Sequence, residues 1–534
     1  MGAGDDVTKS LVCVFAIKAL TMAFGVLLAT IPTARAQLSP AAKCNTTVNI
    51  SVDDRIAGCT AVIEATPANL QGTIFAYFRR AMFLLQKGEV DRAIADYNHV
   101  IEHDPKNQIA FLRRAWAHKG KGEVDEAIAD YDRAVELNPK DAYAYLGRAG
   151  AYVMKRDADR AIADYGQVIL IHPDNVAAYL GRAEASVLKS EPDRAIADCN
   201  RAIEISPERG AGAGLICRAR VRITNGDFST GLADLNQAIQ FNPKDAGAYL
   251  TRAAAYMMRR DIDSAIADYS EVIAVHQDNV DAYVGRGRAY DFKDEPDRAM
   301  ADCDRAIAIG GQRGATAGLL CRGHTHVAKG DLELASADFD QAIQLSPNAP
   351  GLYESRAAVF LARGDRERAL SDIKQGLQLA PDAPGLYRVA AVVRFQDGLL
   401  SEARDDLVHA SELDRKNPYT QLWLDLVRHK SGQPSGLDEA SGRLDMSEWP
   451  APIVRLFLGA MTLEAVVKAA DDANPVKMKG QLCEAHFYAG ELALAKGATD
   501  EAVRLLRLAA DGCPKTYIEW APANAELRKL DTRH

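Results

Sequence analysis

The stretch Ala127-Ile128-Ala129-Asp130-Tyr131 decides the fold of this chain, because close copies of it return every 34 or 36 residues. The copies begin at Ala93, Ala127, Ala161, Ala195, Gly231, Ala265, Ala299, Ala335, Ala369 and Ala403. A unit of this length cannot bury its apolar face alone. It buries that face only when it stacks on neighbouring units. The sequence therefore predicts a solenoid, and the functional question moves from catalysis toward binding.

Each period contains two amphipathic helices. If Pro139 is given position 32, the second repeat covers residues 108–141. Lys121-Gly122 splits it and Pro139 ends it, because glycine and proline interrupt helices. Apolar residues occupy positions 4, 8, 11, 20, 24 and 27, which is the spacing of two apolar helix faces. We therefore expect an all-α chain of helix–turn–helix units.

This pattern resembles the tetratricopeptide repeat (TPR) family. The carrying features are the 34-residue period, small residues at positions 8 and 20, aromatic residues at 4, 11 and 24, and proline at 32. One unit shows them as Tyr145, Ala149, Tyr152, Ala161, Tyr165 and Pro173. The resemblance covers residues 71–417 in ten units. It implies a right-handed superhelical α-solenoid whose first helices line a concave groove.

The composition excludes several classes of function. The 534 residues carry a formal charge of −9, with 48% hydrophobic and 26% charged residues, which is ordinary for a globular protein. No basic footprint is present, so we expect no nucleic-acid partner. The sequence has no glycine-rich phosphate loop, nucleophile elbow or metal-spaced histidines. We expect no cofactor, no metal site and no enzyme activity.

The first 36 residues read as a secretory signal peptide. Two lysines precede the apolar run Ala19–Ile31, and Thr33-Ala34-Arg35-Ala36 places small residues at positions −3 and −1 of a cleavage site. Cleavage before Gln37 would give a periplasmic protein without an integral membrane segment. The alternative is an uncleaved anchor, although the apolar run of 13 residues is short for a ~20-residue span.

An even number of cysteines would remain after cleavage. In an exported protein such a set is expected to form disulfides. Two pairs join position 24 of one repeat to position 6 of the next, at the two 36-residue intervals, and they lie 104 residues apart. A block of three repeats has therefore been duplicated. We expect Cys44–Cys59, Cys199–Cys217, Cys303–Cys321 and Cys483–Cys513. Metal or redox sites are the alternatives, but no Cys-x-x-Cys or zinc-type spacing supports them.

Position 7 carries arginine in nine units, and position 23 of the same units carries aspartate. Facing positions of a hairpin predict a ladder of ion pairs, because arginine prefers bidentate carboxylate partners. The pairs are Arg80–Asp96, Arg114–Asp130, Arg148–Asp164, Arg182–Asp198, Arg218–Asp234, Arg252–Asp268, Arg286–Asp302, Arg322–Asp338 and Arg356–Asp372. The functional alternative is an anion-binding stripe.

The flanks of the array differ from its middle. Residues 37–70 predict an N-terminal cap, a lone helix carrying Cys44 and Cys59. Residues 418–474 lose the period and predict an irregular helical connector. Residues 475–534 restore it as an eleventh repeat and a capping helix, which such arrays need.

The region from Trp449 to Leu530 resembles the C-terminal part of NlpI-type envelope lipoproteins. The carrying segments are Trp449-Pro450-Ala451-Pro452, Leu456-Phe457-Leu458-Gly459, Glu484-Ala485-His486-Phe487-Tyr488-Ala489-Gly490-Glu491 and Glu526-Leu527. The resemblance implies a scaffold that brings peptidoglycan hydrolases and a processing protease together.

The TPR resemblance also implies which residues face a partner. Helix positions 2, 5, 9, 12 and 13 point into the groove, which is expected to hold a protein or peptide ligand, either extended or helical. The expected contact residues are Phe75, Phe78, Met82, Leu112, Trp116, Arg220 and Arg288. The alternative for position 5 is packing between adjacent helices. The lysine-and-asparagine clamp that some relatives use at positions 5 and 9 is absent.

The sequence thus predicts an exported scaffold that binds protein or peptide partners in the bacterial cell envelope, among them peptidoglycan hydrolases or proteases. One alternative is an accessory subunit of a polysaccharide or protein export complex. Another is enzyme activity in the C-terminal region.

Overall fold

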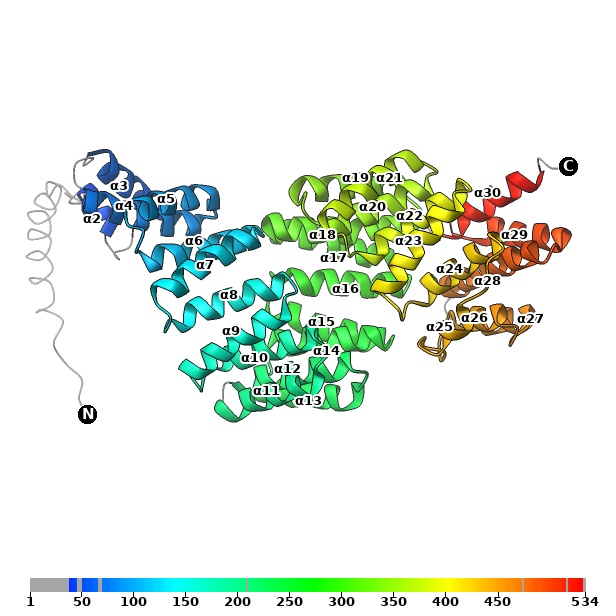
Figure 1. Ribbon diagram of the computed structural model, residues 1–534, viewed down its shortest axis with the longest axis horizontal. Coiled ribbons are helices and arrows are strands. Elements are labelled where there is room, and N and C mark those ends of the chain that lie inside the picture. The colour runs from blue at the N-terminus through cyan, green and yellow to red at the C-terminus, as the bar shows by residue number, and fades with distance from the viewer. Residues whose placement is uncertain are drawn as a thin grey trace, which may run out of the picture. The chain divides into compact units, whose positions relative to one another are not determined.

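The computed structural model describes residues 38–45, 50–65, 70–207, 210–472, 475–514 and 517–531 (Figure 1). These residues form helices α2 to α30 and no strand. The prediction of an all-α solenoid is confirmed. The expected signal peptide, residues 1–36, lies outside the described residues. The chain divides into two compact units, residues 1–206 and 207–534.

The first unit consists of helical hairpins in chain order. Its helices are α2 (Pro40–Asn45), α3 (Val52–Ala65), α4 (Leu70–Lys87), α5 (Val90–His103), α6 (Gln108–Lys121), α7 (Val124–Leu137), α8 (Ala142–Met154), α9 (Ala158–Ile171), α10 (Val176–Leu188) and α11 (Pro192–Ile205). The cap differs from the lone helix we expected. The short helix α2 precedes α3 and packs on it, because the Cys44–Cys59 disulfide ties the two together.

The second unit continues the hairpins and ends in a more irregular region. The regular helices are α12 (Gly210–Thr224), α13 (Phe228–Phe241), α14 (Ala246–Met258), α15 (Ile262–Val275), α16 (Val280–Phe292), α17 (Pro296–Ile309), α18 (Gly311–Lys329), α19 (Leu332–Leu345), α20 (Pro350–Ala362), α21 (Arg366–Leu379), α22 (Pro384–Gln396) and α23 (Leu400–Leu413). The last are α24 (Pro418–Lys430), α25 (Leu437–Ser441), α26 (Ala451–Phe457), α27 (Leu463–Ala469), α28 (Pro475–Ala495), α29 (Thr499–Gly512) and α30 (Trp520–Asp531).

Caps and turns explain where the helices begin and end. In several repeats the residue two positions after the repeat proline is Asn or Asp, and its side chain accepts a backbone hydrogen bond at the start of the next first helix, as Asn107 does from the Ala110 amide. Ala349 and Ala383 occupy this position before α20 and α22 without a side-chain cap. The turn inside each hairpin needs a left-handed residue. Gly122 supplies it with φ 80°, whereas Arg156 and Ser190 adopt φ 59° and 60° at the same position without being glycine.

Small residues and one aromatic ring set the distance between helices. Ala149 and Ala161, at positions 8 and 20, are completely buried. The Tyr131 ring at position 24 fills the space against Gly147 of the next repeat, where an added Cβ would lie 2.4 Å from a ring carbon. The successive first helices then contact one another, for example α6 with α8 and α14 with α16. The first helices therefore form the inner layer of each unit.

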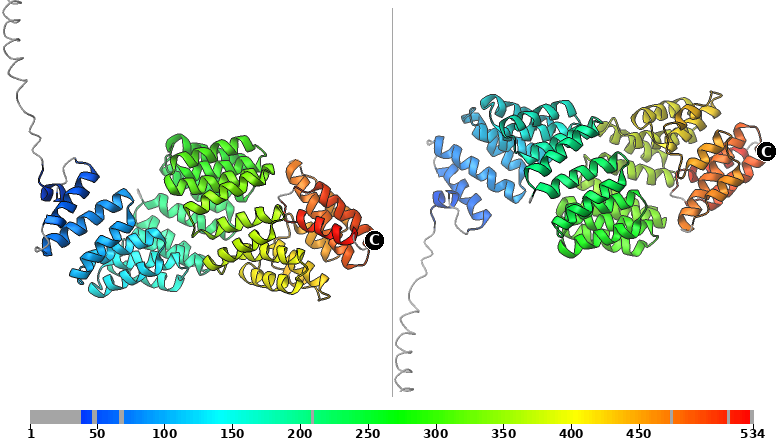
Figure 2. Two further views of the ribbon diagram at one scale, coloured as in Figure 1. Left: turned by 90° about the horizontal axis from the view of Figure 1, so that it is seen from above. Right: turned by 90° about the horizontal axis from the view of Figure 1, so that it is seen from below.

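The C-terminal region of the second unit folds back onto the repeats. Its core centres on Trp423, whose ring lies 5.4 Å from that of Phe395 and 5.6 Å from that of Phe487. Helix α30 contacts the first helices α20 and α22, and α28 contacts α24. Figure 2 shows the C-terminal helices, in orange and red, next to the yellow and yellow-green end of the repeats. Lys430 on α24 forms ion pairs with Glu491 on α28 and Glu526 on α30, at 3.0 and 2.9 Å. This closure places α18, α22, α24, Pro514 and residues 517–519 around one pocket.

Candidate binding sites

The arginine–aspartate pairs are built as bidentate ion pairs inside each hairpin. In all nine, Nε lies 2.7–2.9 Å from one carboxylate oxygen and Nη2 lies 2.6–2.8 Å from the other. The aspartates are 4–6% exposed. Because the carboxylate engages both Nε and Nη2, this geometry supports a structural ladder rather than an anion-binding stripe.

A further contact of these arginines was not anticipated from the sequence. In most units Nη1 reaches a polar side chain at position 25 of the preceding repeat. These acceptors are Thr60, Asn98, Asp132, Asn236, Ser270, Asp304 and Asp340. Arg182 has no such contact among the described residues, since the corresponding residue is Gly166. The signal was available as a polar residue two positions after most of these aspartates. The ladder therefore also joins successive repeats.

Three of the expected cysteine pairs are disulfide-bonded in the structure. The Cα–Cα distances are 4.6 Å for Cys44–Cys59, 5.6 Å for Cys303–Cys321 and 4.8 Å for Cys483–Cys513. Cys303–Cys321 takes the place of the Tyr–Gly contact between repeats, so a covalent bond replaces ring packing there. Cys199 and Cys217 are also disulfide-bonded. Their pairing with each other stays a prediction.

The seven predicted contact residues fall into two groups. Phe78, Met82 and Leu112 are half-buried, and Phe78 and Leu112 pack against hydrophobic clusters of the repeats. This placement fits the alternative that position 5 packs between helices. The other four are exposed on first helices: Phe75, Trp116, Arg220 and Arg288. Only Phe75 and Trp116 among them are apolar, and both belong to the first unit.

Two more exposed apolar residues, Ile109 and Tyr143, lie in the first three repeats together with Phe75 and Trp116. Phe75 on α4, Ile109 and Trp116 on α6, and Tyr143 on α8 are 50%, 56%, 56% and 79% exposed. We call these four residues the apolar row. The helices that carry the apolar row, α4, α6 and α8, are consecutive first helices of the inner layer. Helix α6 contacts α8 directly. Exposed aromatic side chains on such a surface are typical of protein interaction sites.

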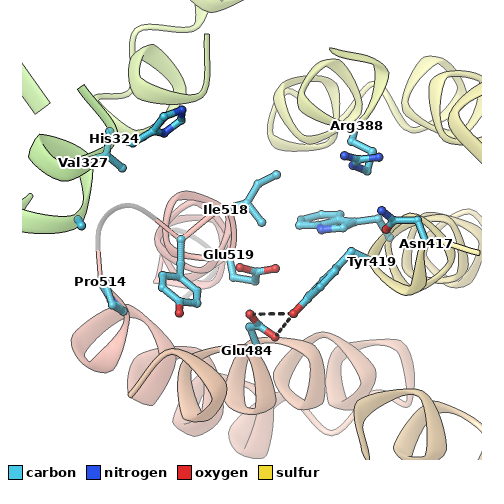
Figure 3. Close-up of a pocket in the computed structure, with 12 residues that line it drawn as sticks. His324, Val327, Arg388, Asn417, Tyr419, Glu484, Pro514, Ile518 and Glu519 are labelled. Atoms are coloured by element: carbon cyan, nitrogen blue, oxygen red, sulfur yellow. Dashed lines mark hydrogen bonds between the residues drawn. The ribbon is translucent and has the colours of Figure 1, made fainter. Parts of the chain in front are cut away.

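The second unit contains a pocket of about 580 Å³. Its walls come from His324, Val327 and Ala328 on α18, Arg388 on α22, Tyr419 and Trp423 on α24, and Glu484 on α28. Asn417, Pro514 and residues 517–519 complete it. Figure 3 shows Arg388 and Asn417 on one side and Glu484 on the opposite side. The sequence did not predict this pocket, whose walls lie up to 195 positions apart, from 324 to 519.

The acidic side of the pocket is held by hydrogen bonds within the chain. Tyr419 donates its hydroxyl to Glu484 at 3.1 Å (Figure 3), and the Trp449 indole donates to the same carboxylate at 2.6 Å. Tyr488 donates to Glu519 at 3.3 Å. Trp449 and Glu484 belong to two different segments of the NlpI-like motif. The motif thus joins the connector to α28.

Burial changes the ionisation of the pocket residues. It raises the pKa values of Glu484 and Glu519, and the charge of Glu484 raises that of Glu519 further. Desolvation by the surrounding protein atoms lowers the pKa of His324 to about 4, and the positive charge of Arg288 lowers it further. His324 is therefore neutral at pH 7, and both carboxyl groups keep their protons to a higher pH than an ordinary glutamate does. The described residues contain no cluster of histidine, cysteine or acidic side chains suited to a metal.

Two family models identify the repeat. Residues 112–171, 146–209, 250–313 and 322–384 match the tetratricopeptide repeat family, and residues 76–107 match a second description of the same repeat. This is a tetratricopeptide repeat protein. The TPR resemblance predicted from the sequence is confirmed.

Among curated proteins, this TPR chain is 31% identical to the lipoprotein NlpI homolog of Haemophilus influenzae over 134 residues. The match spans 24% of the TPR chain and 42% of that relative, which is less than half of the relative's length.

Solved TPR structures include a protein of Parabacteroides merdae, with 18% identity, a TM-score of 0.36, and coverage of 54% of this chain and 98% of that one. Another is a thermophilic TPR protein of Thermus thermophilus, with 19% identity, a TM-score of 0.30, and coverage of 34% and 99%.

The TPR numbering places both surfaces on inner positions of first helices. Phe75, Ile109 and Tyr143 occupy position 2, and Trp116 occupies position 9. The α18 residues of the pocket occupy positions 9, 12 and 13, and Arg388 occupies position 5. Among the described helices of this TPR protein, none is both long enough and apolar enough to cross a membrane.

Proposed function

We propose that this TPR protein is an exported scaffold that binds protein or peptide partners along the inner layer of its first unit. The apolar row carries this proposal. Four large apolar side chains at inner positions of three successive first helices are half or more exposed. A partner that covers these side chains would remove them from water, which is the main driving force for association.

We further propose that the scaffold acts in the bacterial cell envelope. The bonded cysteines, the signal-like N-terminal sequence and the similarity to a protein named as a lipoprotein NlpI homolog support this location. Peptidoglycan hydrolases or proteases are the partner class that the NlpI resemblance implies. Catalysis in this account belongs to the partners.

The test removes two members of the apolar row. Full-length protein is immobilised, and envelope extracts are passed over wild type and over Trp116→Ala/Tyr143→Ala. Aromatic anchors in interfaces contribute about 2 kcal/mol or more each, so retained partners should fall at least tenfold. The matched control is Leu170→Ala, which removes a 74% exposed apolar residue from the second helix α9. Equal retention by wild type and the double variant would contradict the proposal.

A further inference from the structure

We propose that the C-terminal region and the repeats of the second unit enclose a cleft that binds a neutral oligosaccharide. The cleft joins the pocket of about 580 Å³ to two smaller cavities, and we call it the three-cavity cleft. The inference does not depend on the proposed scaffold function, because it concerns another class of ligand and the other unit of the chain.

The three cavities adjoin one another because they share walls. A cavity of about 360 Å³ lies between the pocket and a third cavity of about 390 Å³. The shared residues are Tyr419, Glu484 and Tyr517 at the first junction, and Arg260, Trp449, Lys477 and Gln481 at the second. Each volume is within the usual range of small-ligand pockets, roughly 300–1,000 Å³. A ligand that fills the cleft is therefore a chain of several small units.

Aromatic side chains stand at both junctions of the three-cavity cleft. Tyr419 and Tyr517 line the first junction, Trp449 lines the second, and all three are half-buried. Phe292 at the end of α16 adds a ring that is 56% exposed to the middle cavity. The C–H groups of a sugar ring carry partial positive charge and pack on the negative face of an aromatic ring. Rings spaced along a cleft thus suit successive sugar units.

Neither sign of charge predominates in the walls. Each cavity has basic and acidic residues, namely Arg388 and Glu484 in the pocket, Lys477 and Asp294 in the middle cavity, and Arg455 and Glu448 in the third. Some of these charges already have partners within the chain. Lys477 pairs with Asp472, and Glu484 accepts hydrogen bonds from Tyr419 and Trp449. A wall of mixed charge favours an uncharged ligand over a polyanion or a polycation.

Neutral polar groups are left for a ligand. Gln481 on α28 is 8% exposed, lines two of the three cavities, and forms no side-chain hydrogen bond with the described residues. Asn417 uses its side-chain oxygen to cap α24, at 3.1 Å from the Thr420 amide, and its amide nitrogen has no acceptor among the described residues. An amide both donates and accepts, as the hydroxyl groups of a sugar do. A bound hydroxyl would therefore satisfy groups that the chain leaves unsatisfied.

The walls suit a sugar better than an extended peptide. A peptide gains specificity by placing alternate side chains in pockets of the receptor. Val327 and Ile518 supply aliphatic surface in the pocket, but the aliphatic residues that line the other two cavities are only Pro452 and Ala469. The large apolar surfaces of the middle cavity are aromatic rings, which match the flat faces of sugars.

Isothermal titration calorimetry of the oxidised full-length protein tests the proposal. The probes are the β-1,4-linked hexasaccharides of N-acetylglucosamine and of glucose, each with its disaccharide as reference. We expect at least one hexasaccharide to bind, and to bind about tenfold or more tightly than its disaccharide, because it spans adjoining cavities. The two sugars distinguish an acetamido-bearing chain from one that carries only hydroxyl groups. Absence of binding by both hexasaccharides, or equal binding of hexasaccharide and disaccharide, would overturn the proposal.

Variants assign the binding to the cleft. Tyr517→Leu removes a ring at the first junction but keeps an apolar side chain, and it should weaken binding about tenfold. Gln481→Met keeps the length of the side chain without its amide and should weaken binding about fivefold. It should not lower the stability of the free protein, since Gln481 has no hydrogen bond there to lose. Trp116→Leu, the matched control in the first unit, should leave sugar binding unchanged. Binding that survives both cleft substitutions in folded protein would contradict the assignment.

A peptide arm separates the two classes of ligand. A pool of random pentapeptides should not displace the hexasaccharide. If the pool binds with a dependence on Tyr517 and Gln481 while the sugars do not bind, the cleft is a peptide site and the proposal is wrong. Tyr517→Leu should retain envelope partners as well as wild type does, so failure of the sugar cleft and failure of the scaffold function give different results.

Discussion

At the scale of single residues, the repeats are stabilised by the position-7 arginine, whose guanidinium makes up to three kinds of contact. The guanidinium holds the aspartate of its own hairpin and, in most units, a polar residue of the preceding repeat. It also lies near an aromatic ring at position 4, as Arg148 does at 5.4 Å from the Tyr145 ring centroid. The usual TPR residue at this position is apolar. Here a hydrogen-bonded charge occupies the same space.

The pair Arg182–Asp198 offers the cleanest test, because Arg182 makes no hydrogen bond to position 25 of the preceding repeat, where Gly166 has no side chain. Asp198→Ala should lower the free energy of unfolding by about 3 kcal/mol, since it leaves a largely buried guanidinium unpaired. Arg182→Leu/Asp198→Leu should cost less than Asp198→Ala, because no charge is left behind. Urea unfolding of the single and double variants measures the coupling. Additive losses would show that the two side chains do not act as a pair.

At the scale of elements, the contact between an aromatic ring and a glycine sets the spacing of neighbouring repeats. Tyr131, Tyr165 and Tyr269 each abut a glycine at position 6 of the next repeat, namely Gly147, Gly181 and Gly285. Cys303–Cys321 replaces the same contact by a bond. Packing and disulfide are therefore two solutions to one requirement, the close approach of a second helix to the next first helix.

Gly147→Ala should disturb this approach. The new Cβ would lie 2.4 Å from the Tyr131 ring, so the helices must move apart, and we expect a loss of about 1–3 kcal/mol in the free energy of unfolding. Gly166→Ala is the control, because nothing lies within 4 Å of its added Cβ in the middle of α9. It should stabilise the protein by about 0.5–1 kcal/mol. Chemical denaturation distinguishes the two, and similar losses for both would contradict ring-limited spacing.

The contact of α16 with α18 introduces a pH dependence. Asp291 accepts a hydrogen bond from Thr325 at 2.8 Å, and burial raises its pKa to about 6. An acid whose pKa is raised on folding stabilises the fold below its unfolded pKa of about 4, and this stabilisation is lost as the pH rises to 6 and beyond.

Asp291→Asn removes the titrating group. After allowance for solvent screening, the variant should be about 1–2 kcal/mol more stable than wild type at pH 8, and the difference should vanish or reverse near pH 4. Thermal or urea unfolding across this pH range measures it. A difference that is independent of pH would show that Asp291 does not titrate between the folded and unfolded states.

The helices and their register were predictable because they depend on local spacing. The 34-residue period, the position-7 arginine and the position-24 ring each recur at fixed intervals, so one repeat explains the others. The pocket was not predictable, because Arg388, Glu484 and Glu519 come from segments with no common period. They meet only when α28 to α30 fold back on the first helices. Phe78 and Leu112 illustrate another limit: an inner position does not by itself separate an exposed side chain from one packed between helices.

At the scale of the whole molecule, the described part of each unit includes a surface that its own packing does not use. The first unit exposes the apolar row, and the second contains the pocket. Both surfaces lie on the first helices of TPR hairpins, whereas the arginine ladder and the disulfides hold the hairpins together. Stabilising residues and partner-binding residues thus occupy different positions of the same repeat.

The central claim, that partners bind the inner layer of the first unit, is tested most directly by photocrosslinking in cells. A photoreactive phenylalanine replaces Tyr143, which is 79% exposed on α8, or Leu170, which is 74% exposed on α9. Illumination should give discrete crosslinked protein species from position 143 and none from position 170. Crosslinks of equal yield from both positions, or from position 170 alone, would contradict the account.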